Sequence, residues 1–181
     1  MLRSAMGYLA AADATAMEAA MQAQCLRTLE QFHAIETAAR ASVLGALASA
    51  RTDTSRSDAG RAGAADFSPR SWLVRETGVT TGTATGHAAW ARRAAEHPQV
   101  TEALAEGHRL SESVARTICT WTDKLPADCR VAADVILIVA AKSGANVRDL
   151  AEVFGGIYTL ARPRPGLVPA PEPAVISAVA I

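Results

Sequence analysis

The sequence has few aromatic residues and no long apolar run. Aromatic residues make up only 4% of the 181 residues, whereas hydrophobic residues reach 50%, largely because alanine is so common. Alanine has the best helix propensity and few strand formers compete with it, so this composition favours closely packed helices over a sheet. No run approaches the roughly 18 apolar residues that a transmembrane helix needs, so we expect no membrane partner. The composition therefore predicts an all-α fold.

The chain also lacks a charge excess of either sign. It has 18 basic and 18 acidic residues, and its formal net charge is zero. A protein that binds DNA through phosphates usually carries a basic excess, because Lys and Arg release the counterions condensed on DNA. The neutral balance thus argues against strong DNA binding by the chain as a whole, while it leaves room for a local basic face.

Cysteine is scarce and scattered, with Cys25, Cys119 and Cys129 as its three instances. No C-x-x-C pair occurs and no histidine lies at zinc-ligand spacing, which argues against a disulfide framework and a structural zinc site. We interpret the three thiols as small buried apolar groups of a cytoplasmic protein. The sequence also shows no nucleophile–base pair, no paired carboxylates and no phosphate-cradling loop. We therefore predict no catalytic site, metal, cofactor or small-molecule ligand.

The N-terminal third reads as one long helix between two irregular segments. We expect a flexible segment over 1–15, a helix from about Ala16 to Ala50 and a polar loop over 51–67. The helix carries an apolar face at three- and four-residue steps, formed by Leu26, Leu29, Phe32, Ala39, Val43, Ala46 and Leu47. At roughly 50 Å it exceeds the needs of a small domain. It can pack across the whole domain or pair with a second copy.

Residues 68–96 predict two short helices joined by a tight turn. Ser68 followed by Pro69 is a favourable start, because serine caps a helix and proline fits its first position. Gly78 is a typical C-terminal stop. Thr80 or Thr81 can cap the next helix, so the pair has the layout of a helix-turn-helix.

Further along the chain, Pro98 predicts a short helix ending near Gly107, and Ser111 caps another. Pro126 opens a helix that contains the run Val135–Val139. This β-branched run is also compatible with a buried strand. Because a lone strand has no partner, we interpret it as the most buried helix.

The last predicted helix begins at Asn146, which with Asp149 resembles a capping box. Its apolar face is formed by Leu150, Val153, Phe154, Ile157 and Leu160. From Arg162 the chain contains five prolines within twelve residues. We predict a disordered, Pro-rich linker or tail over 162–181.

Short motifs occur in a fixed order along the chain: Trp72-Leu73, Thr77-Gly78-Val79, Trp90-Ala91, Ala103 to Gly107, Leu110-Ser111 and Leu125-Pro126. In order and spacing they resemble the domain of unknown function 222, the N-terminal part of actinobacterial 13E12 repeat proteins. The resemblance spans about residues 20 to 161. It implies one helical domain over 16–161.

Full-length members of that family typically continue through a Pro-rich linker into an HNH nuclease domain, where metal-bound histidines and cysteine pairs cleave phosphodiester bonds. This sequence reaches Ile181 within what looks like that linker, and its four histidines lie in no HNH-like context. The resemblance therefore implies a non-catalytic module of an HNH nuclease family, truncated, split or acting as an accessory domain. The alternative is a protein–protein interaction or dimerisation domain without DNA binding.

The helix-turn-helix layout suggests where nucleic acid would bind. The early residues of a recognition helix face base edges, but here they are small and lack the bidentate contacts of strong base readout. Arg92 and Arg93 come late in that helix and suit phosphate positioning or an ordinary solvated face. The candidate contacts are Arg70, Arg75, Thr81, Thr83, Thr85, His87, Arg92 and Arg93. A purely structural hairpin is the competing interpretation, because this shape recurs in proteins that bind no DNA.

The remaining aromatic and histidine residues have structural interpretations. Trp72, Trp90 and Trp121 are flanked by apolar positions, so we predict that they pack in the core. His97 precedes Pro98 and His108 follows Gly107, so both are predicted as solvated residues at helix boundaries.

Overall fold

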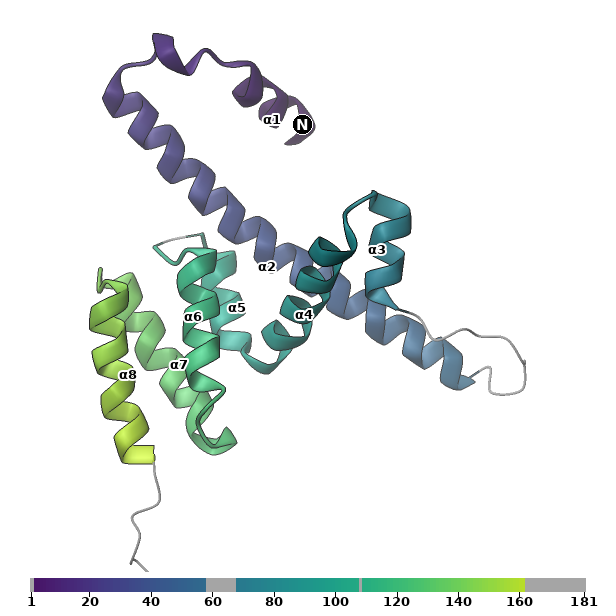
Figure 1. Cartoon of the computed structure of the whole chain (residues 1–181), viewed down its shortest axis with the longest axis vertical. Helices are drawn as coiled ribbons and strands as arrows, with labels where there is room; N and C mark the ends of the chain where they lie inside the picture. Colours follow the sequence, from purple (N-terminus) through teal and green to yellow (C-terminus); the bar gives the residue numbers. More distant parts are fainter. Residues whose placement is uncertain (1, 58–67, 108, 162–181) are drawn as a thin grey trace, which may run out of the picture.

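The computed structural model describes residues 2–57, 68–107 and 109–161, and every regular element among them is helical (Figure 1). The all-α prediction is confirmed. The predicted tail 162–181 and His108 lie outside the described residues. The elements are α1 (Leu2–Ala11), a short 3-10 helix η1 (Ala14–Ala16), α2 (Ala19–Ser57), α3 (Pro69–Thr77), α4 (Thr81–Glu96), α5 (Pro98–Ala105), α6 (Glu112–Thr122), α7 (Ala127–Lys142) and α8 (Val147–Ala161).

The long helix α2 crosses the molecule, and α3, α4, α5 and α6 pack against it (Figure 1). Its packed face is made of small residues and one leucine, namely Ala34, Ala38, Ala41 and Leu44. Alanines on this face let α4 and α5 approach closely. The part of α2 before Ala34 extends away from this body, and its side chains are mostly exposed.

Two predicted boundaries at the ends of this region differ from the structure. Segment 1–15 holds α1 and most of η1, so the structure gives helical backbone where we predicted none. Asp13 explains η1, because its carboxylate accepts a hydrogen bond from the Thr15 backbone N–H at 2.9 Å and caps the turn. The predicted loop 51–67 is wrong over 51–57, where α2 continues to Ser57, and 58–67 lie outside the described residues.

The helix ends that the sequence predicts locally are confirmed. The Ser68, Thr80 and Ser111 hydroxyls accept hydrogen bonds from backbone N–H groups three residues later, at 3.3, 3.2 and 3.4 Å. Gly78 ends α3 in the left-handed conformation, with φ of 69°. At the start of α8 the Asp149 carboxylate accepts from the Asn146 N–H at 3.0 Å, as a capping box requires.

The run Val135–Val139 is helical, but α7 is not uniformly buried there. Leu137 and Ile138 are buried, whereas Val135, Ile136 and Val139 are 44%, 48% and 58% exposed. The prediction of the most buried helix is therefore wrong for this run. The buried residues of α7 are Ala133, Asp134, Leu137, Ile138 and Ala141, which share one side of the helix, and α5, α6 and α8 are the helices packed against it.

The tryptophans pack as predicted. Trp90 is buried in the core, and Trp72 and Trp121 are half-buried against it. Trp121 stacks on Phe154 with ring centroids 5.6 Å apart, which attaches α8 to α6. Among the described residues, no helix is both long enough and apolar enough to span a bilayer.

Candidate functional site

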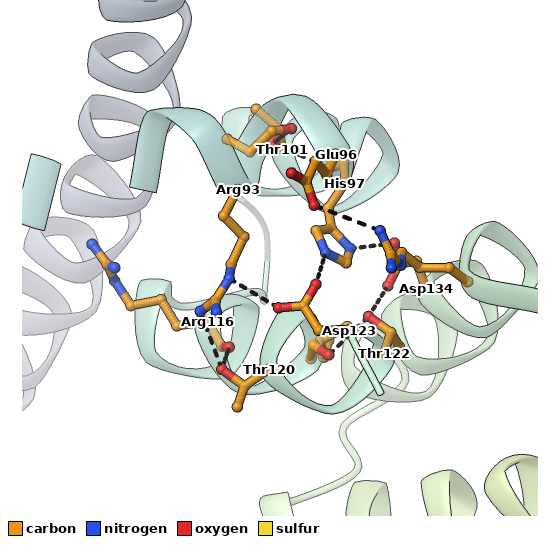
Figure 2. Close-up of polar contacts among 12 residues, drawn as sticks. Arg93, Glu96, His97, Thr101, Arg116, Thr120, Thr122, Asp123 and Asp134 are labelled. Atoms are coloured by element: carbon orange, nitrogen blue, oxygen red, sulfur yellow. Dashed lines mark hydrogen bonds and ion pairs between the residues drawn. The ribbon is translucent and has the colours of Figure 1, made fainter. Parts of the chain in front are cut away.

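A buried histidine joins three parts of the helical body. His97, at the α4–α5 junction, is completely buried, so the prediction of a solvated boundary residue is wrong. Its Nδ1 lies 2.8 Å from Asp134 Oδ2 on α7, and its Nε2 lies 2.9 Å from Asp123 Oδ1 after α6. The Thr122 hydroxyl donates to the other oxygen of Asp134 at 2.7 Å. Figure 2 shows the imidazole between the two carboxylates.

The chemistry of this network is that of a structural cross-link. An ionised carboxylate only accepts hydrogen bonds, so both ring nitrogens of His97 donate when Asp123 and Asp134 are ionised, and the ring is then an imidazolium. Buried charges are tolerated when they are paired and hydrogen-bonded. A ring with no exposed surface cannot reach a substrate, so we assign His97 a structural role.

Asp123 extends the network to the surface. It is about a quarter exposed, and its second oxygen pairs with Arg93 Nε at 3.1 Å. Arg93 also donates to the Thr120 hydroxyl at 3.4 Å. The buried His97 thus fixes the carboxylate that holds the Arg93 guanidinium in place.

Arg93 lies in a polar groove between α4, α6 and α7, with a volume of about 530 Å³. Four arginines and two carboxylates line it, namely Arg92, Arg93, Arg116, Arg130, Glu96 and Asp123. We call this set the arginine groove. Its arginines outnumber its carboxylates, so the groove is locally positive in a chain whose net charge is zero.

The four arginines differ in how strongly they are held. Arg92 is exposed and has no ion-pair or hydrogen-bond partner within the described ranges. Arg130 contacts Glu96 at 3.6 Å, while its buried Nε has no partner among described atoms. Arg116 lies over the Trp90 ring, 4.5 Å from the centroid, and its Nε donates to Glu112 at 2.6 Å. Arg92, and in part Arg130, therefore leave the groove with donors that no carboxylate of the described residues engages.

The structure brings only some of the predicted contact residues together. Arg92 and Arg93 share the arginine groove. On the same helix, Thr81, Thr83 and Thr85 are exposed near its N-terminus. Thr85 donates back to the Thr81 carbonyl at 2.8 Å, so its hydroxyl proton is already engaged.

The other predicted contacts lie apart from the groove. Arg70 and Arg75 are exposed on α3, and Arg75 pairs with Glu76 at 2.7 Å. His87 is half-buried against α2, where Arg40 donates to its Nε2 at 2.7 Å. Burial lowers the pKa of His87, and the positive charge of Arg40 lowers it further. A neutral, inward-facing ring is unsuited to the predicted phosphate contact.

Sequence reasoning missed Arg116, Arg130 and the His97 network. Arg116 lies on the predicted helix opened by Ser111, but nothing in its local sequence shows that it shares a groove with α4. Asp123 and Asp134 are separated from His97 by 26 and 37 positions. Their association depends on the tertiary packing, which periodicity within one helix cannot reveal.

The cysteines and the metal-ligating residue types are further candidate reactive groups among the described residues. Burial, reinforced by the nearby Asp134 and Asp123 carboxylates, raises the pKa of the Cys119 thiol to about 12, so it stays protonated. Cys25 and Cys129 are free and half-exposed. No group of three or more His, Cys, Asp or Glu side chains that could hold a metal ion occurs within the parts of the chain that the structure describes.

Comparison with known proteins adds no assignment: no family model, no curated protein and no solved structure matches the chain. The resemblance to the domain of unknown function 222 therefore stays a prediction drawn from the motifs.

Proposed function

We propose that the chain is a non-catalytic helical module that binds nucleic acid through its phosphate groups and works with an HNH nuclease domain, as the family resemblance implies. The observation that carries the proposal is the arginine groove. It gathers four guanidinium groups from three helices in a chain of zero net charge. The planar guanidinium group of arginine presents paired N–H donors whose spacing matches two phosphate oxygens. Such a groove is therefore suited to a sugar–phosphate backbone.

The arrangement favours positioning over base reading. Phosphate contacts fix the register of a protein on nucleic acid but carry no sequence information. The exposed Thr81 and Thr83 lie on the same helix as Arg92 and can donate to further phosphates. None of these residues makes the bidentate base contacts that specify sequence strongly. We therefore expect binding that depends on salt and little on sequence.

Salt-dependent binding to a labelled duplex tests this proposal. If two to three phosphates are neutralised, log K should fall with log salt with a slope of about −2 to −3. The double variant Arg92→Gln/Arg130→Gln should weaken binding and flatten the slope by up to about 2. Fluorescence anisotropy at low ionic strength measures both quantities.

Arg75→Gln is the matched control, because Arg75 is paired with Glu76 on α3 and lies outside the groove. It should bind like the parent protein. Absence of binding at low salt and micromolar protein would contradict the proposal. Equal losses in the Arg75 variant and the groove variant would contradict the assigned site.

A second candidate function is self-association through the projecting part of α2. Met21, Leu26 and Leu29 are 57%, 64% and 39% exposed there, and large apolar side chains exposed close together mark an interaction surface. Light scattering should then report a dimer that Leu26→Glu converts to a monomer. A parent protein that is monomeric at high concentration would exclude this function.

A further inference from the structure

The first part of α2 forms an arm that stands clear of the helical body (Figure 1). We define the arm as residues 19–33, which precede Ala34, the first buried residue of α2. Its large apolar side chains gather on one side of the helix at three- and four-residue steps, namely Met21, Cys25, Leu29 and Phe32, with Leu26 beside them. Met21, Leu26 and Leu29 are exposed, so this apolar side faces solvent in the single chain.

The opposite side of the arm is polar. Gln24, Arg27 and Gln31 follow one another at steps of three and four residues and are all exposed. Arg27 Nη2 donates to Gln24 Oε1 at 3.0 Å, which confirms that their side chains share this side. The arm is therefore amphipathic, and an amphipathic helix of this kind binds by laying its apolar side into a groove.

An apolar groove lies further along the same helix, between α2 and the α4–α5 pair. Its volume is about 630 Å³, and α2 contributes the wall from Ile35 to Gly45. Alanine is the commonest residue of its lining, and Glu102 is the one charged residue among the described residues that form it. We call this space the α2–α5 groove.

The arm and the α2–α5 groove are complementary in size as well as in polarity. The groove has small walls, formed on α2 by Ala38 and Ser42 and across from it by Ala95 and Ala105. The arm carries larger side chains, including Leu29 and Phe32. Large side chains facing small ones interdigitate, and this arrangement gives close packing without strain.

The arm cannot fill the groove of its own chain. The arm and the α2 wall of the groove belong to one unbroken helix, Ala19–Ser57, and a helix cannot fold back onto its own next turns. The arm of a second copy has no such constraint. A two-fold axis with the two α2 helices antiparallel makes this contact occur twice, once in each groove.

We propose that the arm of one copy docks into the α2–α5 groove of a second copy, whose own arm fills the first groove in return. This inference rests on the second candidate function, self-association through α2, and adds the surface that receives the arm. It requires no nucleic acid.

The expected interface is small but sufficient. An arm of 15 residues measures about 22 Å by 12 Å. Two arms, with both partners counted, then bury on the order of 1,000 Å², which is near the lower bound for a specific interface. We therefore expect a weak dimer whose population depends on protein concentration.

A charge placed in the groove tests the docking. Ser42 is exposed and lines the groove, so Ser42→Glu sets a carboxylate against the apolar side of the arriving arm. The dissociation constant of the dimer, measured by analytical ultracentrifugation, should rise at least about tenfold. Ala105→Glu places the same charge on the opposite wall and replaces Ser42→Glu if that variant disturbs α2.

Ala20→Glu is the matched control, because Ala20 is exposed on the polar side of the arm, one turn before Gln24. It should dimerise like the parent protein. Equal weakening by Ala20→Glu and Ser42→Glu would overturn the docking, since both would then act through charge alone.

The native cysteines give a second measurement without any substitution. Cys25 lies on the apolar side of the arm, whereas Cys129 lies on α7 outside the groove, and both are half-exposed. The alkylation of Cys25 should slow as the protein concentration rises through the dimer range, while that of Cys129 stays constant. Ser42→Glu should restore the fast alkylation of Cys25.

The outcomes separate this inference from the function on which it rests. A parent protein that stays monomeric at high concentration rejects both. A dimer that Leu26→Glu disrupts but Ser42→Glu and Ala105→Glu leave intact supports self-association and overturns docking into the groove, because the arms then pair with each other.

Discussion

Two histidines on neighbouring stretches of the chain lie in opposite polar environments. His97 is completely buried, and both of its nitrogens face carboxylates that are themselves held by Thr122 and Arg93. His87 is half-buried beside Arg40, whose guanidinium donates to its ring and also pairs with Glu36. Carboxylates around a buried ring favour its charged form, whereas a neighbouring guanidinium favours the neutral form. The comparison shows how packing against different helices gives two histidines of one helical body opposite electrostatic environments.

The largest expected effect comes from breaking the His97 cluster. Asp134→Ala leaves the His97 ring buried without one of its two carboxylates, and removing one partner of a buried pair costs about 3–5 kcal/mol. Urea unfolding should show this loss. Glu102→Ala, an exposed carboxylate on α5, serves as the control and should change stability by less than about 0.5 kcal/mol. A loss below about 1 kcal/mol for Asp134→Ala would mean that the network is not structural.

A smaller effect is expected when the same cluster keeps its charges and loses a neutral donor. Thr122→Val removes the hydroxyl that donates to Asp134, and a buried acceptor left short of a partner costs about 1–3 kcal/mol. Thr117→Val, on the same helix, removes a hydroxyl outside the network that donates to the Ser113 carbonyl. Its cost should stay within about 0.5 kcal/mol. Chemical denaturation of both variants measures the difference, and equal losses would contradict it.

The environment of His87 should make the stability of the fold depend on pH. The folded-state pKa of His87 lies below its unfolded value because burial and then Arg40 disfavour the charged ring. The unfolded state therefore binds more protons as pH falls below about 6.5, and the stability of the folded state declines in that window. Glu36, Arg116 and Glu112 also face this ring.

His87→Gln should remove this decline, so its stability profile between pH 7 and 5 should be flatter than that of the parent protein. His33→Gln, an exposed histidine contacting Glu112 in the same cluster, provides the comparison and should retain the His87 decline. Parallel profiles for the parent and His87→Gln would show that the environment of His87 does not shift its protonation.

The smallest effect on stability is expected at Arg92. It is exposed and unpaired within the described ranges, so Arg92→Ala should change the unfolding free energy by less than about 0.5 kcal/mol. Its effect on nucleic-acid affinity should nevertheless be measurable, because it lines the arginine groove. A destabilised Arg92 variant would mean that the groove arginines belong to the structural network.

The fold was predictable where the signal is local. Ser68, Thr80 and Ser111 cap helices by bonding backbone groups three residues away, and a single sequence contains all the information for such contacts. The helical conformation of Val135–Val139 was also predicted correctly, but the extent of its burial was not. Which side of α7 is covered depends on α5, α6 and α8, so composition alone overestimates the burial of an apolar helix.

The site was only partly predictable for the same reason. Arg92 and Arg93 were identified because they lie on one short helix with the threonines. His97 was misread because a histidine before a proline commonly marks a solvated helix boundary, and the carboxylates that bury it come from α7 and the end of α6. Long-range polar pairing leaves no periodic trace in the sequence.

The His97 network also has a consequence for folding. It links residues 26 and 37 positions apart, so a partly folded chain with α4 and α5 packed but α7 detached would bury a charged group without its partner. Such intermediates are disfavoured by the cost of an unpaired buried charge. We therefore expect α4 to α7 to open as one cooperative unit, with amide protons on these helices exchanging through a common, nearly global unfolding event.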